Sequence, residues 1–130
     1  MSGFSLAGAR VATRLPAQDL DRARRWYAEK LGLEPADERP GGLLYRMPNG
    51  EFALYASQGE SSGTFTQMAL EVDDIDAAVA ALRERGVELH ELGVVDIEGQ
   101  YPSKHAVGER ATWFYDSERN LIGIGQLLPD

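Results

Sequence analysis

Cysteine is absent from this chain of 130 residues, and long hydrophobic runs are missing as well. Without cysteine the protein has no disulfide, no thiolate nucleophile and no cysteine-bound zinc. The absence of cysteine also means that cysteine usage does not indicate the redox compartment in which the protein works. No apolar run approaches the roughly 18 residues that a membrane-spanning helix needs. The N-terminus also lacks the basic and then apolar segments of a signal peptide. We therefore expect a cytoplasmic protein with no membrane partner.

Basic residues are in the minority. The chain has 21 Asp and Glu against 13 Lys and Arg, which gives a formal net charge of -8. A chain this acidic is repelled by phosphate backbones, so no nucleic-acid partner is expected. The hydrophobic share of 43% and the charged share of 26% are typical of a globular protein. The length suits one domain, which we place at residues 7–128.

The first half of the chain has the pattern of a strand, a helix and a hairpin. Asp19 is a typical N-cap and Gly32 a typical C-cap, while Pro48-Asn49-Gly50 is a strong hairpin signal. The expected elements are a strand at 11–15 closed by Pro16, a helix at 20–31, a loop at 35–42, and strands at 43–47 and 51–57.

The pattern restarts after a polar linker at 58–63. Asp73 or Asp74 caps a second helix, which buries Ile75, Val79 and Leu82 and ends at Gly86. The other expected elements are a strand at 67–72, a segment at 87–92 that could form a strand, a loop at 94–109, and a final hairpin with strands at 111–115 and 121–127.

The two halves match in sequence as well as in order. Asp19-Leu20-Asp21 corresponds to Asp74-Ile75-Asp76 at an offset of 74 − 19 = 55, and residues 49–55 correspond to 119–125 at an offset of 119 − 49 = 70. A unit of this kind buries one sheet face and needs a partner to complete a core. We therefore predict two modules, at about 9–58 and 65–128. The alternative is a chance likeness between two ordinary α/β units.

Three segments resemble, in order, the motifs of the vicinal-oxygen-chelate superfamily, which contains glyoxalases, bleomycin resistance proteins and extradiol dioxygenases. They are DLDRARRWYAEKLGL at 19–33, ALEVDDI at 69–75 and WFYDSERNLI at 113–122. The resemblance implies an α+β fold of two tandem βαβββ modules that form a cup-shaped mixed sheet with the helices outside. It also implies a homodimer, because the family commonly completes its cups between chains.

The resemblance also implies four positions for the ligands of a divalent metal, and these fall at Ala12, Ala53, Gln67 and Gly123. Three of the four have no donor atom, and one amide oxygen cannot hold a divalent ion against water. We therefore expect no metal and no other cofactor. His90 and His105 lie outside these strands, and each is interpreted as an exposed or loop histidine rather than a metal ligand.

Strand alternation indicates which side chains would share the cup with the four lost ligands. Arg10 and Arg14 fall on the cup side of the first strand, and the loop at 94–109 is long enough to form a lid. The expected ligand-binding residues are Arg14, Tyr55, Gln67, Trp113, His105 and Tyr101. Aromatic walls with a few polar groups suit a planar or partly aromatic ligand.

Each of these assignments has an ordinary alternative. Trp113 and Tyr55 could be core aromatics, since an error of one residue in register reverses the face. Arg14 could pair with a surface carboxylate. For Gln67, a structural amide bonded to backbone is the favoured role.

These observations favour non-catalytic binding of a hydrophobic or aromatic compound, such as an antibiotic or another natural product, over catalysis. The first alternative is a glyoxalase- or dioxygenase-like enzyme. A metal-independent lyase, isomerase or cyclase using Arg14, His105 or Tyr55 is favoured over a metal-dependent one. The second alternative is a structural or protein-binding module whose own side chains fill the cup. The catalytic residues of an enzyme, and the identity of any ligand, are not predicted.

Overall fold

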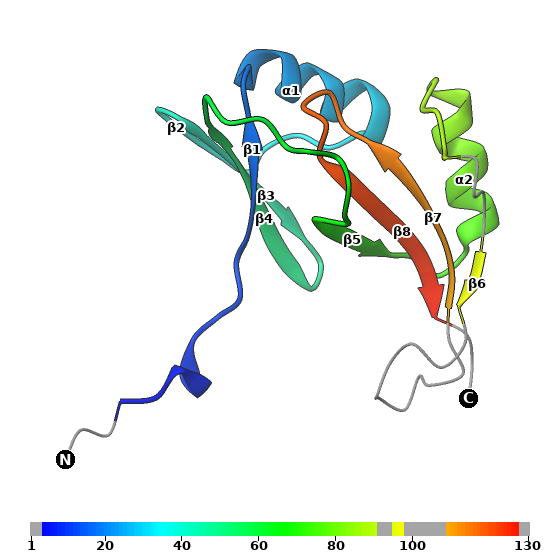
Figure 1. The fold of residues 1–130 in the computed structure, drawn as a ribbon, viewed down its shortest axis with the longest axis horizontal. Coiled ribbons are helices and arrows are strands. Elements are labelled where there is room, and N and C mark those ends of the chain that lie inside the picture. Colours follow the sequence, from blue (N-terminus) through cyan, green and yellow to red (C-terminus); the bar gives the residue numbers. More distant parts are fainter. Residues whose placement is uncertain (1–3, 91–94, 98–108, 128–130) are drawn as a thin grey trace.

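The computed structural model describes residues 4–90, 95–97 and 109–127. Its strands form two four-stranded sheets, one from each half of the sequence (Figure 1). A short 3-10 turn at Leu6–Gly8 comes first. The first module then consists of β1 (Thr13–Ala17), α1 (Leu20–Trp26) with a π-helical turn (Tyr27–Leu31), β2 (Asp37–Arg39), β3 (Gly42–Met47) and β4 (Gly50–Ala56).

The second module repeats this order with β5 (Met68–Glu71), α2 (Ile75–Glu84), β6 (Val95–Ile97), β7 (Glu109–Tyr115) and β8 (Leu121–Leu127). The strand orders are β1-β4-β3-β2 and β5-β8-β7-β6, and in both sheets the first strand runs parallel to the last. The predicted α+β fold of two βαβββ modules is confirmed, with the strands in two separate sheets.

The strand registers repeat as closely as the element order does. Arg14 on β1 is opposite Ala53 on β4, and Ala69 on β5 is opposite Gly123 on β8. The offsets are 69 − 14 = 55 and 123 − 53 = 70, the same two offsets that relate the halves of the sequence. The two modules are therefore equivalent residue by residue along these strands.

Both helices begin at the predicted caps. The carboxylate of Asp19 accepts a hydrogen bond from the backbone N–H of Arg22 at 2.9 Å, and that of Asp74 accepts one from Ala77 at 3.0 Å. The first helix ends at Gly32, whose φ is 70°. This left-handed conformation favours glycine, and a Cβ at this position would also lie 2.7 Å from Nη1 of Arg85, whose side chain would have to move.

Two short strands were not predicted. β2 lies within the expected loop at 35–42, and β6 lies within the expected loop at 94–109. Each has three residues and pairs with a single neighbour at the edge of its sheet. Three residues cannot display a period of two clearly, and each strand exists through its pairing with the next strand along the chain.

Two boundaries also differ from expectation. Pro16 was expected to close the first strand, but β1 continues through it to Ala17. β1 is an edge strand paired only with β4, and a proline is tolerated where no second neighbour needs its N–H. Residues 87–90 form no strand, and the rest of the segment that could have been one, at 91–92, lies outside the described residues.

A single hydrophobic cluster joins the modules. α1 lies over the upper ends of both sheets, and α2 flanks the second sheet (Figure 1). Trp26 of the first module stacks on Phe114 of the second, with ring centroids 6.1 Å apart. The buried cluster comprises Leu15, Ala17, Ala23, Tyr27, Leu43, Tyr45, Phe52, Leu54, Leu82, Val87, Phe114, Ile122 and Ile124.

A buried polar turn adds a second connection between the modules. Residues 116–120, between β7 and β8, were expected only to reverse the chain, but three of their side chains bind the first module. The Asp116 carboxylate accepts a hydrogen bond from the hydroxyl of Tyr27 at 2.7 Å. The Asn120 amide donates to the carbonyl of Pro16 at 3.0 Å, and Glu118 pairs with Arg22. We call residues 116–120 the clasp.

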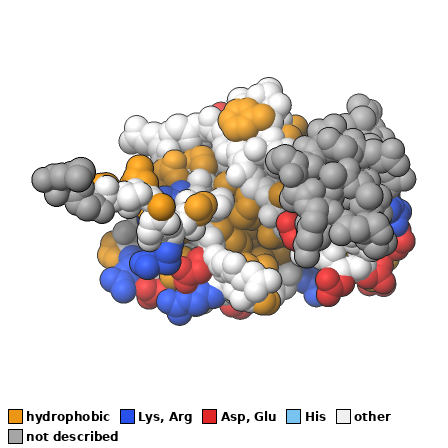
Figure 2. Space-filling view, turned by 90° about the horizontal axis from the view of Figure 1, so that it is seen from below, with side chains coloured by type: hydrophobic (Ala, Val, Ile, Leu, Met, Phe, Trp, Pro, Cys, Tyr) orange, Lys and Arg blue, Asp and Glu red, His pale blue; other side chains and the backbone are white. Residues whose placement is uncertain are grey.

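Apolar side chains remain exposed on one side of the molecule. The segment before β1 extends away from the sheets (Figure 1), and its Phe4, Leu6 and Val11 are largely exposed. Seen from below, hydrophobic side chains gather in a recess at the centre of the face (Figure 2). Among the described residues, no helix is long and apolar enough to cross a membrane.

Candidate functional site

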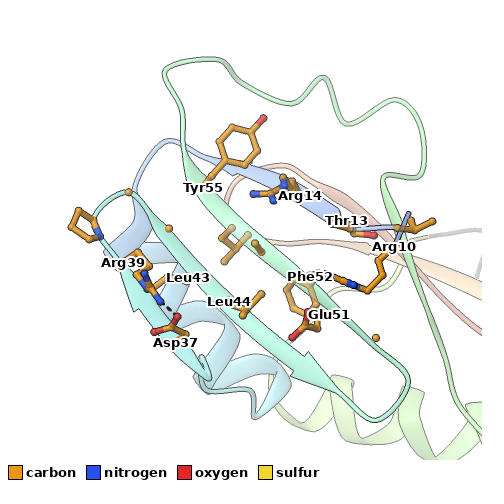
Figure 3. A pocket seen from close by; sticks show the side chains of 18 of the residues that line it. Arg10, Thr13, Arg14, Asp37, Arg39, Leu43, Leu44, Glu51, Phe52 and Tyr55 are labelled. Atoms are coloured by element: carbon orange, nitrogen blue, oxygen red, sulfur yellow. Dashed lines mark hydrogen bonds and ion pairs between the residues drawn. The ribbon is translucent and has the colours of Figure 1, made fainter. Parts of the chain in front are cut away.

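A pocket of about 780 Å³ lies over the first sheet. All of its lining comes from residues 10–55, so it belongs to the first module alone. Figure 3 shows Arg14 and Tyr55 on the neighbouring strands β1 and β4, with Leu44 across the sheet and Arg10 near one end. The lining includes the side chains of Arg10, Arg14, Asp37, Arg39, Leu44, Glu51, Ala53 and Tyr55.

Strand register explains which side chains reach this pocket. Ala53 in β4 lies between Arg14 on β1 and Leu44 on β3, so these three form one row across the sheet. Their chain neighbours point to the other face, where Leu15, Phe52 and Leu54 are buried. The small side chain of Ala53 leaves the middle of the row open, and Tyr55, a residue that is 40% exposed, lies beside it.

Of the six residues predicted to bind a ligand, the structure brings Arg14 and Tyr55 together in this pocket. The exposure of Tyr55 excludes the alternative that it is a core aromatic. Within the described residues, Arg14 makes no ion pair with a carboxylate. Tyr101 and His105, also predicted, lie outside the described residues.

Gln67 does not line the pocket, and its side chain is committed to the second module. Its Nε2 donates to Ser61 Oγ and Asn120 Oδ1, both at 3.0 Å, and its Oε1 accepts from the backbone N–H of Leu121 at 3.2 Å. Both the nitrogen and the oxygen of the Gln67 amide are therefore hydrogen-bonded within the protein. These bonds fit the structural amide that the sequence favoured.

Trp113 lies on β7 opposite Gly123, on the pleat face that the sequence assigned to it, but outside the first-module pocket. Its indole Nε1 donates to Thr66 Oγ1 at 3.0 Å, and a Cβ added at Gly123 would lie 3.3 Å from the same nitrogen, so the ring occupies the space beside this glycine. Because the indole is half-buried and hydrogen-bonded, its contacts are those of a residue that packs over the second sheet.

The four positions of the implied metal site do not fit a divalent ion. Ala12 and Ala53 line the first-module pocket and offer no donor, and Gly123 on β8 offers none either. Gln67 already spends its amide on three internal hydrogen bonds. Among the described residues, no three His, Asp or Glu side chains gather as metal ligands would.

His90 is half-buried beside a second recess of about 550 Å³, whose lining includes Trp26 and Tyr115. The imidazole meets the Tyr115 ring edge to face, with centroids 4.8 Å apart. His90 lies in a segment that is neither helix nor strand, as a loop histidine does, and its imidazole packs against an aromatic ring.

The sequence missed the charged residues that β2 and β4 bring to the pocket. Asp37 and Arg39 sit on the unpredicted strand β2 and bind each other, with Nε and Oδ2 3.0 Å apart. Glu51 on β4 is held by Arg46 of β3 at 2.8 Å. The alternation of the predicted strand at 43–47 already placed Leu44 and Arg46 on one face, and this signal could have identified that side of the pocket.

The clasp and its partner Tyr27 contain groups whose pKa values are shifted by burial and by hydrogen bonds. Burial raises the pKa of Asp116 by more than the hydrogen bonds from Asn120 and Tyr27 lower it. Burial also raises the pKa of Tyr27 well above its usual value. For Glu118 burial acts in the same direction, but hydrogen bonds from Arg22, Ser117 and the backbone of Asp19 outweigh it and lower the pKa to about 2.

The sequence matches the model of the Glyoxalase/Bleomycin resistance protein/Dioxygenase superfamily over residues 9–124. The chain therefore belongs to this superfamily, as its three motifs indicated. A comparison with curated proteins gives no match.

Solved structures agree in fold. One is a glyoxalase/bleomycin resistance protein/dioxygenase from Alicyclobacillus acidocaldarius, 16% identical over 95% of this chain and 94% of that one, with a TM-score of 0.74. Another, from Nocardioides, is 23% identical over 98% and 86%, with a TM-score of 0.68. The antibiotic binding protein TnmS3 from Streptomyces sp. CB03234 is 25% identical over 95% and 100%, with a TM-score of 0.66.

Proposed function

We propose that this protein binds a hydrophobic or aromatic small molecule in the first-module pocket, without catalysis and without a metal. The pocket itself carries the proposal. Its volume of about 780 Å³ lies within the range of ligand sites, roughly 300–1,000 Å³. Ala53 and Leu44 make a small and apolar floor, and the exposed ring of Tyr55 offers a face for stacking.

The chemistry of the four implied metal positions supports binding over the metal-dependent reactions of the superfamily. Those reactions need an ion with an open coordination position, and such a site takes two or three carboxylate or imidazole ligands. Here the corresponding residues are two alanines, a glycine and a glutamine whose amide is already bonded. A preformed pocket is sufficient for sequestration.

The likeness to TnmS3 supports the class of ligand. That protein is described as an antibiotic binding protein, and it aligns with nearly the whole of this chain. An antibiotic or another natural product with an aromatic part is therefore the ligand that we propose.

The test is a thermal-shift screen of neutral, anionic and cationic aromatic compounds, with hits measured by calorimetry on three proteins. Ala53→Trp places an indole in the middle of the pocket floor and should abolish binding. Ala69→Trp adds the same side chain to an exposed position of the second sheet and should leave binding unchanged. A ligand at 100 times its Kd raises the free energy of unfolding by about 2.7 kcal/mol, which is a readily detected shift. The proposal fails if no compound binds, or if every hit binds Ala53→Trp as tightly as the original protein.

A further inference from the structure

Building on the proposed function, we infer that the ligand is an anion, namely an aromatic molecule whose carboxylate, sulfonate or phosphate group is bound by Arg14 while its ring lies against Tyr55. The charges that line the first-module pocket, and their partners, carry this inference.

Two carboxylates line the pocket, and an arginine holds each of them. Asp37 pairs with Arg39 at 3.0 Å and Glu51 pairs with Arg46 at 2.8 Å. The remaining charged side chains in the lining are Arg10 and Arg14. Within the residues that the structure describes, neither of these two forms an ion pair or a side-chain hydrogen bond. The pocket therefore has two positive charges that its own acids do not neutralise.

This excess is local. The chain has 21 acidic and 13 basic residues, so its surface as a whole attracts cations and repels anions. A pocket with the opposite sign to the rest of the molecule favours anionic ligands over cationic ones. The reason is that electrostatic energy falls with distance, and a bound ligand lies nearer to the charges of the pocket than to those of the remaining surface.

The position of Arg14 suits it to bind an anionic group on an aromatic ligand. Arg14 is opposite Ala53 in the strand register, and Tyr55 follows two residues later on β4, on the same face. Figure 3 shows the guanidinium and the phenol ring next to each other above this part of the sheet, with Arg10 near the other end of the pocket. A guanidinium presents a planar fork of N–H donors that matches two oxygens of a carboxylate, sulfonate or phosphate.

The experiment compares two fluorescent probes with one ring system. 1-Anilinonaphthalene-8-sulfonate carries a sulfonate, and N-phenyl-1-naphthylamine is the same molecule without it. Both are titrated into the original protein, Arg14→Met, Arg14→Lys, Arg83→Met and Ala53→Trp, at 50 and 500 mM NaCl. Arg83 lies on α2 in the second module, exposed and outside the pocket lining, and so controls for the loss of one positive charge. A cooperative thermal transition for every variant ensures that the probes report on folded protein.

We expect the original protein to bind one sulfonate probe per chain, at least about tenfold more tightly than the neutral probe. Arg14→Met should weaken the binding of the sulfonate probe by about the same factor and change the affinity for the neutral probe by no more than about twofold. Arg14→Lys should retain part of the preference for the sulfonate. Higher salt should weaken only the sulfonate. Arg83→Met should match the original protein.

The possible failures are distinguishable. If both probes bind equally, and Arg14→Met affects neither while Ala53→Trp abolishes both, then the pocket is a ligand site but the anion inference is wrong. If both probes bind Ala53→Trp as they bind the original protein, the first-module pocket is not their site, and the proposed function and the inference fail together.

Discussion

Arg22 on α1 and Glu118 in the clasp are 96 residues apart in the sequence and form a two-pronged ion pair. Nε of Arg22 lies 2.8 Å from Oε2 of Glu118, and Nη2 lies 2.9 Å from Oε1. The carboxylate side chain is 1% exposed and also accepts from the backbone N–H groups of Gln18 and Asp19. One carboxylate of the second module thus binds two backbone N–H groups just before α1 of the first module, together with an arginine of that helix.

We predict that the Glu118 carboxylate makes the free energy of unfolding fall at low pH. The pKa of Glu118 is about 2 in the folded protein against 4.5 ordinarily, so its contribution is complete above pH 4.5 and is lost as the pH falls toward 2. By linkage the loss is on the order of 3 kcal/mol. Glu118→Gln should lack this contribution at pH 7, and urea unfolding at pH 7 and pH 3 should show a smaller difference in free energy than the original protein shows.

Asp116 acts in the opposite sense, because a raised pKa makes protonation favour the folded state, but it is present in both proteins and cancels in the comparison. Glu51→Gln is the control. It breaks a pair of the same 2.8 Å length between exposed side chains, and such pairs contribute about 0–1 kcal/mol. An unchanged pH dependence in Glu118→Gln would show that the clasp does not stabilise the fold in this way.

Two buried tyrosines provide a matched test of the clasp. The hydroxyl of Tyr27 donates to Asp116 at 2.7 Å, whereas the hydroxyl of Tyr45 is buried with no hydrogen-bond partner among the described residues. Tyr27→Phe should lower the free energy of unfolding by about 1–3 kcal/mol, because it leaves a buried carboxylate short of a donor. Tyr45→Phe should be neutral or stabilising, since it removes an unsatisfied hydroxyl from the same aromatic cluster. Chemical denaturation measures both, and equal losses would contradict the assignment.

Tyr55 and Trp113 should separate ligand binding from packing. Tyr55→Ala removes an exposed ring from the pocket, so a bound aromatic ligand should lose about 1–2 kcal/mol of affinity while the melting temperature changes little. Trp113→Ala should do the reverse, since it removes a half-buried indole and its hydrogen bond to Thr66 at a cost of about 1–3 kcal/mol in stability. Calorimetric titration and thermal unfolding of both variants decide between these roles, and a loss of affinity in Trp113→Ala alone would place the ligand on the second sheet.

The purified protein should contain no stoichiometric nickel, zinc, manganese or iron. Ala12, Ala53 and Gly123 supply no donor, and the Gln67 amide is hydrogen-bonded within the protein. Elemental analysis measures the content directly. Added metal should also leave the melting temperature unchanged, because a ligand stabilises only a state that binds it. One tightly held ion per chain would restore the metalloenzyme as the better hypothesis.

We predict a homodimer in solution. The first-module pocket is lined from one module only, and the largely exposed Leu6 and Val11 on the segment before β1 offer apolar surface for a second chain. Light scattering at micromolar concentration should give about twice the chain mass of 14.3 kDa. A single-chain mass at every concentration tested would rule the dimer out.

Much of the architecture could be predicted from the sequence because its signals are local. Asp19 and Asp74 cap the helices through their own side chains, and Gly32 supplies a backbone conformation that other residues avoid. Alternation along the strands placed Arg14, Ala53 and Tyr55 on one face, and the internal repeat gave the correct correspondence between modules. The caps and the alternation depend on neighbours within a few residues, and the repeat can be read by comparing the two halves of the sequence, so none of them requires knowledge of the tertiary contacts.

Only the tertiary structure decided which of these faces come together. Arg14 and Trp113 both lie on the predicted side of their strands, yet only Arg14 lines the first-module pocket, because the two sheets are separate and the pocket belongs to one of them. β2 and β6 are strands because neighbouring strands supply their hydrogen bonds, and a segment of three residues is too short to show the alternation that predicts a strand. The clasp joins residues 89 to 104 positions apart, and a contact at that separation leaves no local pattern from which it could be read.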